Sequence, residues 1–196
     1  MWQFIKNNFA VRGYQRLLYA LIFALLVWQL SLFWGKWQDG CSSIFYYIHA
    51  PMHEVGHTLV GLVCRSENAI VLAGSVFQVL TPLFVIAYFA WHKDYPAISL
   101  GVGWLGFAIA EVGIYMYDAN LGNLTLVTPF MDASELEGDF TILFRNWNCL
   151  ESGCRIGEIT VGIGYAFVFA ALLMIPLMML LGAITPAPAP SEKSDQ

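Results

Sequence analysis

Long apolar runs separated by short polar connections dominate this chain. Five of them approach the roughly 20 residues that a helix needs to cross a bilayer, and they cover about residues 17–34, 44–64, 69–91, 97–117 and 159–183. Backbone polar groups in hydrocarbon have to be satisfied within the segment itself, which favours helices at these lengths. The pattern therefore predicts an all-α, polytopic membrane bundle with about five transmembrane segments.

Composition agrees with a membrane protein and excludes a nucleic-acid surface. Hydrophobic residues make up 58% of the 196 residues and charged residues 12%, which is about half the charged fraction typical of soluble domains. The net charge of −5 leaves no basic patch that could bind nucleic acid. Lysines and arginines are more frequent on the side of the N-terminus, which favours a cytoplasmic N-terminus. A re-entrant second segment would reverse the side of every later connection.

The organisation predicted from the pattern is a single domain over residues 1–185. The end of the chain, residues 186–196, is a polar tail rich in proline and alanine that cannot build a core, and we expect it to be disordered. The longest connection, 118–158, mixes acidic residues with aromatic and aliphatic ones. This mixture predicts a membrane-dipping connection before the last span and offers a surface for a protein partner.

The second apolar run contains the motif His53-Glu54-Val55-Gly56-His57. Helical residues four apart share a face, so His53 and His57 can direct two imidazoles to one zinc ion with Glu54 beside them. Ionisable groups in a membrane are costly, and a metal would compensate them. The alternative is a pair of core histidines with a partnered glutamate. Pro51, just before the motif, predicts that a helix starts or kinks there.

Zinc hydrolases usually keep three protein ligands and one open position, so a third ligand is needed. Besides Glu54, the acids that we consider as intramembrane or juxtamembrane ligands are Glu111, Asp118 and Asp139. A carboxylate with two neutral imidazoles leaves a net positive zinc, which can lower the pKa of its water. Glu54 could then accept the proton of that water as the general base.

Further polar residues are candidates for supporting the pocket. Glu111, Tyr115 and Asp118 fall on one face of the fourth run, which should point inward. Gln78 is the corresponding residue of the third run. Each has a structural alternative, namely a hydrogen-bond network between helices. His49 is not expected to bind metal, because Pro51 should break the helical register between it and His53.

Four short segments give the chain a likeness to a known family. They are Met52 to Thr58, Gly74 to Gln78 with Pro82, Tyr115 to Ala119, and Gly138-Asp139-Phe140 followed by Leu143. In this order, over about residues 45–145, the chain resembles the site-2-protease-like intramembrane zinc metallopeptidases, and within them a compact group of bacterial membrane proteins. The resemblance implies one Zn²⁺ per chain and a multi-pass protein of the bacterial inner (plasma) membrane. It also implies a third ligand C-terminal to the histidines, which we place on Asp139, with Asp118 as the alternative.

The function predicted on these grounds is that of a zinc-dependent metalloendopeptidase. It would hydrolyse a peptide bond of a membrane-associated protein or peptide substrate, with His53, His57 and Asp139 as zinc ligands and Glu54 as general base. Two alternatives stay open. One is a non-catalytic membrane adaptor that keeps a structural metal site and binds a partner through 118–158. The other is a metal or proton transporter that uses the polar face of Glu111 and Asp118 as its path.

Overall fold

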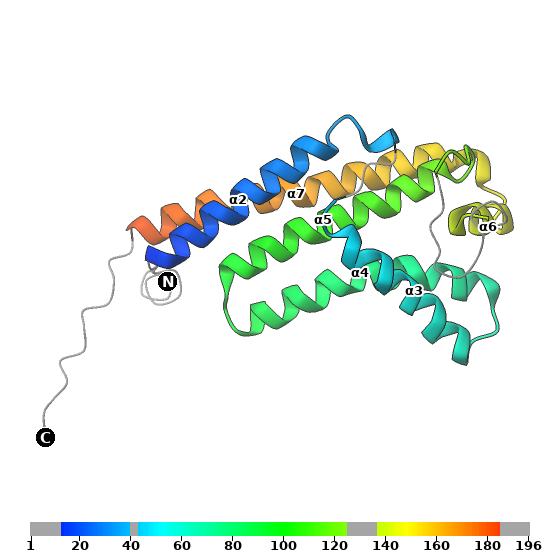
Figure 1. Cartoon of the computed structure of the whole chain (residues 1–196), viewed down its shortest axis with the longest axis horizontal. Helices are drawn as coiled ribbons and strands as arrows, with labels where there is room; N and C mark the ends of the chain where they lie inside the picture. The colour runs from blue at the N-terminus through cyan, green and yellow to red at the C-terminus, as the bar shows by residue number, and fades with distance from the viewer. Residues whose placement is uncertain (1–12, 40–42, 125–136, 185–196) are drawn as a thin grey trace, which may run out of the picture.

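A computed structural model describes residues 13–39, 43–124 and 137–184 of the chain (Figure 1). Within these ranges every regular element is helical, as the sequence predicts. The elements are α2 (Gly13–Phe33), η1 (Trp37–Asp39), α3 (Tyr46–Val63), α4 (Glu67–Trp91), α5 (Tyr95–Asp118), α6 (Asp139–Asn146), η3 (Leu150–Ser152) and α7 (Gly153–Ile184). The predicted tail, 186–196, and part of the acidic connection, 125–136, lie outside the described residues.

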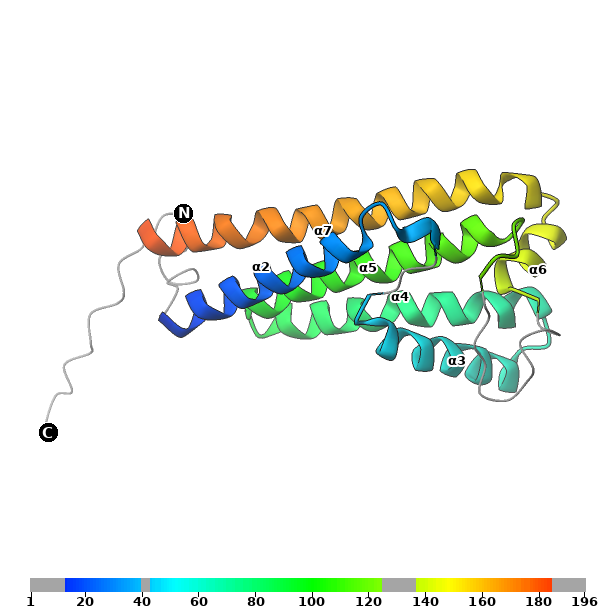
Figure 2. The ribbon, with the colours of Figure 1, turned by 45° about the horizontal axis from the view of Figure 1, so that its top comes forward.

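Four helices, α2, α4, α5 and α7, are long and apolar enough to cross a membrane. The second predicted span forms α3, which has 18 residues and is not among these four. Figure 2 shows α3 lying along the N-terminal half of α4. Its start lies beside the middle of α5. There the ring of Phe45, the residue just before α3, stacks on that of Trp104, with the ring centroids 5.5 Å apart. The predicted five segments thus become four candidate spans and one shorter helix that begins inside the bundle.

Pro51 neither starts nor interrupts α3. It lies in the second turn of a helix that runs without a break from Tyr46 to Val63. The expectation that it breaks the register between His49 and His53 is therefore wrong. Proline has no amide hydrogen, so the carbonyl of Tyr47 loses its i+4 donor, yet the helix continues through this position. As a result, His49, His53 and His57 follow one another on a single face of α3.

Glycines hold α5 and α7 together at very close range. A Cβ at Gly106 would lie 2.7 Å from the carbonyl oxygen of Gly164. One at Gly157 would lie 2.6 Å from the carbonyl oxygen of Gly113. On each helix the two glycines are seven residues apart and so share a face. Small residues allow this backbone contact, which is how helices associate in a membrane, where no hydrophobic force drives them together.

The short helix α6 packs across the end of the bundle opposite the start of α2 (Figure 1). Its apolar residues Phe140, Leu143 and Phe144 are buried. Two hydrogen bonds fix its position, from Thr141 Oγ1 to the carbonyl of Ala119 at 2.8 Å and from Asn146 Nδ2 to Asn68 Oδ1 at 2.7 Å. The connection predicted before the last span therefore contains a helix that is held against α4 and α5.

The glycine contact predicts the effect of adding one methyl group. Gly157→Ala should lower the free energy of unfolding by about 1–3 kcal/mol, because its Cβ meets backbone atoms of α5 that cannot move aside. Gly162→Ala, on the same helix, has nothing within 4 Å of its Cβ and should leave stability unchanged or slightly raised. Unfolding in detergent, followed by circular dichroism, measures both. Equal stability of the two variants would contradict this packing.

Candidate metal centre

Two histidines of α3 and the first residue of α6 converge on one point. His53 Nε2 lies 2.8 Å from Asp139 Oδ2, and His57 Nε2 lies 3.2 Å from the same oxygen. One ligand atom from each residue lies within 4.8 Å of the other two. The side chains of His53, His57 and Asp139 keep 18%, 22% and 26% of their surface exposed, so the cluster is not sealed inside the bundle. Residues that are 86 positions apart in the sequence thus form one cluster.

The orientation of His57 prepares it to bind a metal. Its Nδ1 lies 2.8 Å from the carbonyl oxygen of Ile70, which accepts only, so Nδ1 carries a proton and donates it. In a neutral imidazole the lone pair then sits on Nε2, which faces an oxygen of Asp139. Two lone pairs repel unless a proton or a cation lies between them. A backbone carbonyl that orients the second nitrogen is the usual support of a metal-binding histidine.

Gly74 of α4 forms the floor of this cluster. A Cβ at Gly74 would lie 2.5 Å from His57 Nε2 and 2.6 Å from His53 Nε2. The missing side chain therefore leaves open the space in front of both nitrogens. Gly56 brings the two helices this close, since a Cβ there would lie 2.8 Å from the backbone carbon of Ala73. Neither role was predicted from the sequence, in which Gly74 is only part of a motif.

Asp139 stays ionised in this position. Burial raises the pKa of its carboxyl group, but hydrogen bonds and charges from His53 and His57, when these rings are protonated, outweigh burial and lower the pKa to about 2. Asp139 also occupies the first turn of α6, where the helix dipole favours a negative charge. At neutral pH the cluster therefore offers an anionic oxygen beside two imidazole nitrogens.

Asp118, the alternative third ligand, is engaged elsewhere. Its Oδ1 accepts a hydrogen bond from the amide of Asn123 at 2.9 Å, and its Oδ2 accepts one from the amide of Leu124 at 3.0 Å. These bonds cap the turn that follows α5. The structure thus brings Asp139, and not Asp118, to the histidine pair.

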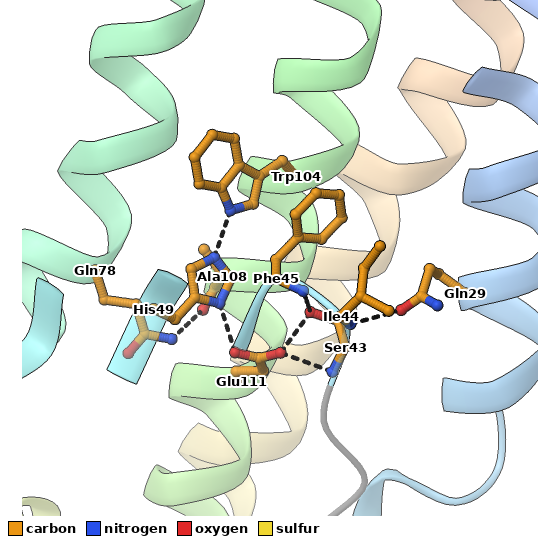
Figure 3. A network of polar contacts seen from close by, with 9 residues as sticks. All are labelled: Gln29, Ser43, Ile44, Phe45, His49, Gln78, Trp104, Ala108 and Glu111. Atoms are coloured by element: carbon orange, nitrogen blue, oxygen red, sulfur yellow. Dashed lines mark hydrogen bonds and ion pairs between the residues drawn. The ribbon is translucent and has the colours of Figure 1, made fainter. Parts of the chain in front are cut away.

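The remaining predicted residues fall into two groups. Glu54 is half-buried on α3 and close enough to His57 for an electrostatic interaction. The ring of Tyr115 stacks on that of His53, with the centroids 6.4 Å apart. Both residues therefore adjoin the centre. Gln78 and Glu111 instead lie in a separate polar network in the interior of the bundle (Figure 3).

Comparisons with models of protein families, with curated proteins and with solved structures found no match to this chain. The donor atoms of the centre are therefore the guide to its chemistry. Two imidazoles and one carboxylate are a donor set typical of a catalytic zinc site. The same donors also bind iron(II) in oxygenases. A measurement of metal content distinguishes the two metals.

The floor of the cluster gives a test that leaves all three ligands in place. Gly74→Ala should abolish metal binding while the helices stay folded, because the new Cβ displaces the ends of two flexible side chains and no backbone. Gly61→Ala is the matched control, since its Cβ approaches only a methyl group of Ile70 at 3.9 Å. Mass spectrometry of metals in the detergent-purified proteins measures the outcome. Wild-type metal content in folded Gly74→Ala would contradict the proposed geometry.

The two aspartates should separate cleanly in the same assay. Asp139→Ala should lose the metal, because it removes one of three ligands. Asp118→Ala should keep about one metal ion per chain and lose only the cap of a turn. Loss of metal from Asp118→Ala, with retention by Asp139→Ala, would reverse the assignment of the third ligand.

Proposed function

We propose that this protein is an intramembrane zinc metallopeptidase of the site-2-protease-like kind. One observation carries the proposal, namely that His53 Nε2, His57 Nε2 and Asp139 Oδ2 converge above Gly74 while Glu54 lies beside them. The spacing of the motif on one helical face supports it from the sequence. The substrate class that we propose is a membrane-associated protein or peptide.

In this proposal His53, His57 and Asp139 hold the zinc ion. Zinc at such a site supplies a Lewis acid that polarises a carbonyl group and makes water more acidic. Hydrolysis adds the oxygen of water to the carbonyl carbon and breaks the carbon–nitrogen bond. Glu54 accepts a proton from the attacking water and delivers a proton to the leaving amine. Glu54 is only partly buried on α3, as a group that exchanges protons with water needs to be.

The position of the centre in the bundle agrees with a hydrolase. Ile70 and Gly74 lie three and seven residues into α4, which is about 5 and 10 Å from its start at the rise of an α-helix. The centre is therefore near one end of the bundle, where water and a peptide chain can both enter. We expect the scissile bond to lie near the end of a membrane segment or just outside it.

Features of the centre favour catalysis over the two alternatives. A structural zinc site is usually closed by four protein ligands, whereas the described part of the chain brings three partly exposed ones together. A transport path along α5 would need polar groups that are free to exchange ions. Glu111 and Asp118 are instead engaged in hydrogen bonds with Ser43 and with two backbone amides.

Glu54→Gln tests the proposed function directly. The variant should keep its zinc and its stability and lose a factor of about 10²–10⁴ in kcat, because the amide cannot accept a proton. Glu67→Gln, an exposed residue at the start of α4, is the control and should keep wild-type activity. Cleavage of a library of membrane-protein fragments in detergent or proteoliposomes gives the rates. A folded wild type with full zinc that cleaves none of them would contradict the proposal.

A further inference from the structure

A second polar cluster lies in the interior of the bundle (Figure 3), and its His49 precedes His53 by one turn of α3. It joins α2, the residues that lead into α3, α3 itself and α5. His49 is 1% exposed and Glu111 is 2% exposed. Ionisable groups buried to this extent in a membrane protein need specific partners, and such groups commonly serve function.

The hydrogen bonds determine where the protons are. Trp104 Nε1 lies 2.6 Å from His49 Nε2, and an indole nitrogen can only donate. His49 Nε2 therefore carries no proton, and the proton of the neutral imidazole is on Nδ1. That nitrogen donates to Glu111 Oε2 at 2.6 Å. The planes of the imidazole and indole rings are inclined to each other by 18°. The two hydrogen bonds together leave His49 neutral, with Glu111 as the acceptor of its Nδ1 proton.

Glu111 also binds the chain that leads into α3. Its Oε1 accepts hydrogen bonds from the amide of Ser43 at 2.9 Å and from the hydroxyl of Ser43 at 2.6 Å. Gln29 Oε1 accepts from the amide of Ile44 at 2.8 Å, and Ser43 Oγ accepts from the amide of Phe45 at 3.2 Å. Inside hydrocarbon no water could satisfy these amides. An anion also suits this place because the start of a helix carries positive partial charge.

We infer that Glu111 is a positioning residue for the metal centre, which it reaches through His49 and helix α3. The inference rests on the metal site of the proposed function. On α3, His49 precedes His53 by one turn, and on α5, Glu111 precedes Tyr115 by one turn. His49 is hydrogen-bonded to Glu111. One turn further along both helices, the ring of His53 stacks on that of Tyr115.

These two contacts keep α3 from sliding along its axis and from rotating about it. A helix transmits such a constraint because its turns are rigidly hydrogen-bonded. His53 and His57 have to present both Nε2 atoms to the small space above Gly74. A slight rotation of α3 would carry one of them out of that space. Glu111 touches neither metal nor substrate and acts only by holding α3 in register.

Glu111→Gln tests the inference, because an amide group cannot replace all three hydrogen bonds. If its NH₂ faces Ser43, the hydroxyl can turn and accept, but the backbone amide of Ser43 can only donate and loses its acceptor. If it faces His49, the imidazole proton has to move to Nε2, where it meets the N–H of Trp104. The dissociation constant for zinc should rise about tenfold or more, as for other residues that orient ligands. The visible absorption of the cobalt(II)-substituted protein should change as well, because the ligands shift.

Two further variants separate positioning from general stability. Ile175→Ala removes buried side-chain atoms in the C-terminal part of α7, and should lower the melting temperature without altering zinc affinity or the cobalt spectrum. Ser43→Ala removes the hydroxyl that donates to Glu111 and accepts from the amide of Phe45, and it keeps the bond from the Ser43 amide to Glu111. It should raise the dissociation constant for zinc by a smaller factor, and it serves as the test if Glu111→Gln does not fold.

Competition with a chelator in detergent measures these affinities. Weaker zinc binding by Glu111→Gln and Ser43→Ala, with unchanged binding by Ile175→Ala, supports the inference. Wild-type zinc affinity and an unchanged cobalt spectrum in folded Glu111→Gln, or in Ser43→Ala in its place, overturn it, whatever the loss of stability. A wild-type protein that binds no zinc would instead overturn the proposed function and, with it, this inference.

Discussion

Helix α3 begins inside the bundle, and the amide groups that lead into it have to find acceptors there. Glu111 and Gln29 supply these acceptors from α5 and α2. An unsatisfied polar group in hydrocarbon costs several kcal/mol, so a helix can start at this depth only where neighbouring helices provide partners. The short helix in turn places its histidine pair at the level of the first turns of α4. The metal centre, and the function proposed for it, depend on this internal start.

Small residues let the helices approach closely, and this close approach positions the polar residues. Gly56 allows α3 to touch the backbone of α4, and Gly74 leaves the space that two imidazole nitrogens face. Elsewhere, the glycines of α5 and α7 make a close contact that holds the frame. Asp139 completes the cluster from α6, which is fixed on α4 by the bond between Asn146 and Asn68. A centre made from three helices therefore relies on contacts that bring backbones together.

The sequence predicts most of the fold, because apolar runs long enough to cross a bilayer have few other structures. Each of the five runs forms a helix, with ends that differ by a few residues. The start of α3 inside the bundle was not predicted, since the run at 44–64 is as apolar as a full crossing. The seven-residue spacing of Gly106 with Gly113, and of Gly157 with Gly164, was a readable signal that was missed.

The candidate site could be predicted from the sequence only where its residues are close together in the chain. The spacing of His53 and His57 is local, and the structure confirms that they share a face. The choice between Asp118 and Asp139 depends on where the chain folds back after α5, which local spacing does not contain. The inward face of Glu111 was predicted, but its partner His49 was set aside because of Pro51.

X-ray absorption at the zinc edge of the purified wild-type protein tests the central claim most directly. We predict two imidazole nitrogens and a carboxylate oxygen at about 2.0–2.2 Å, with no sulfur in the coordination shell. A sulfur at about 2.3 Å would show that a cysteine binds the metal and would contradict the account. The absence of bound zinc from a folded protein purified without chelators would contradict it as well.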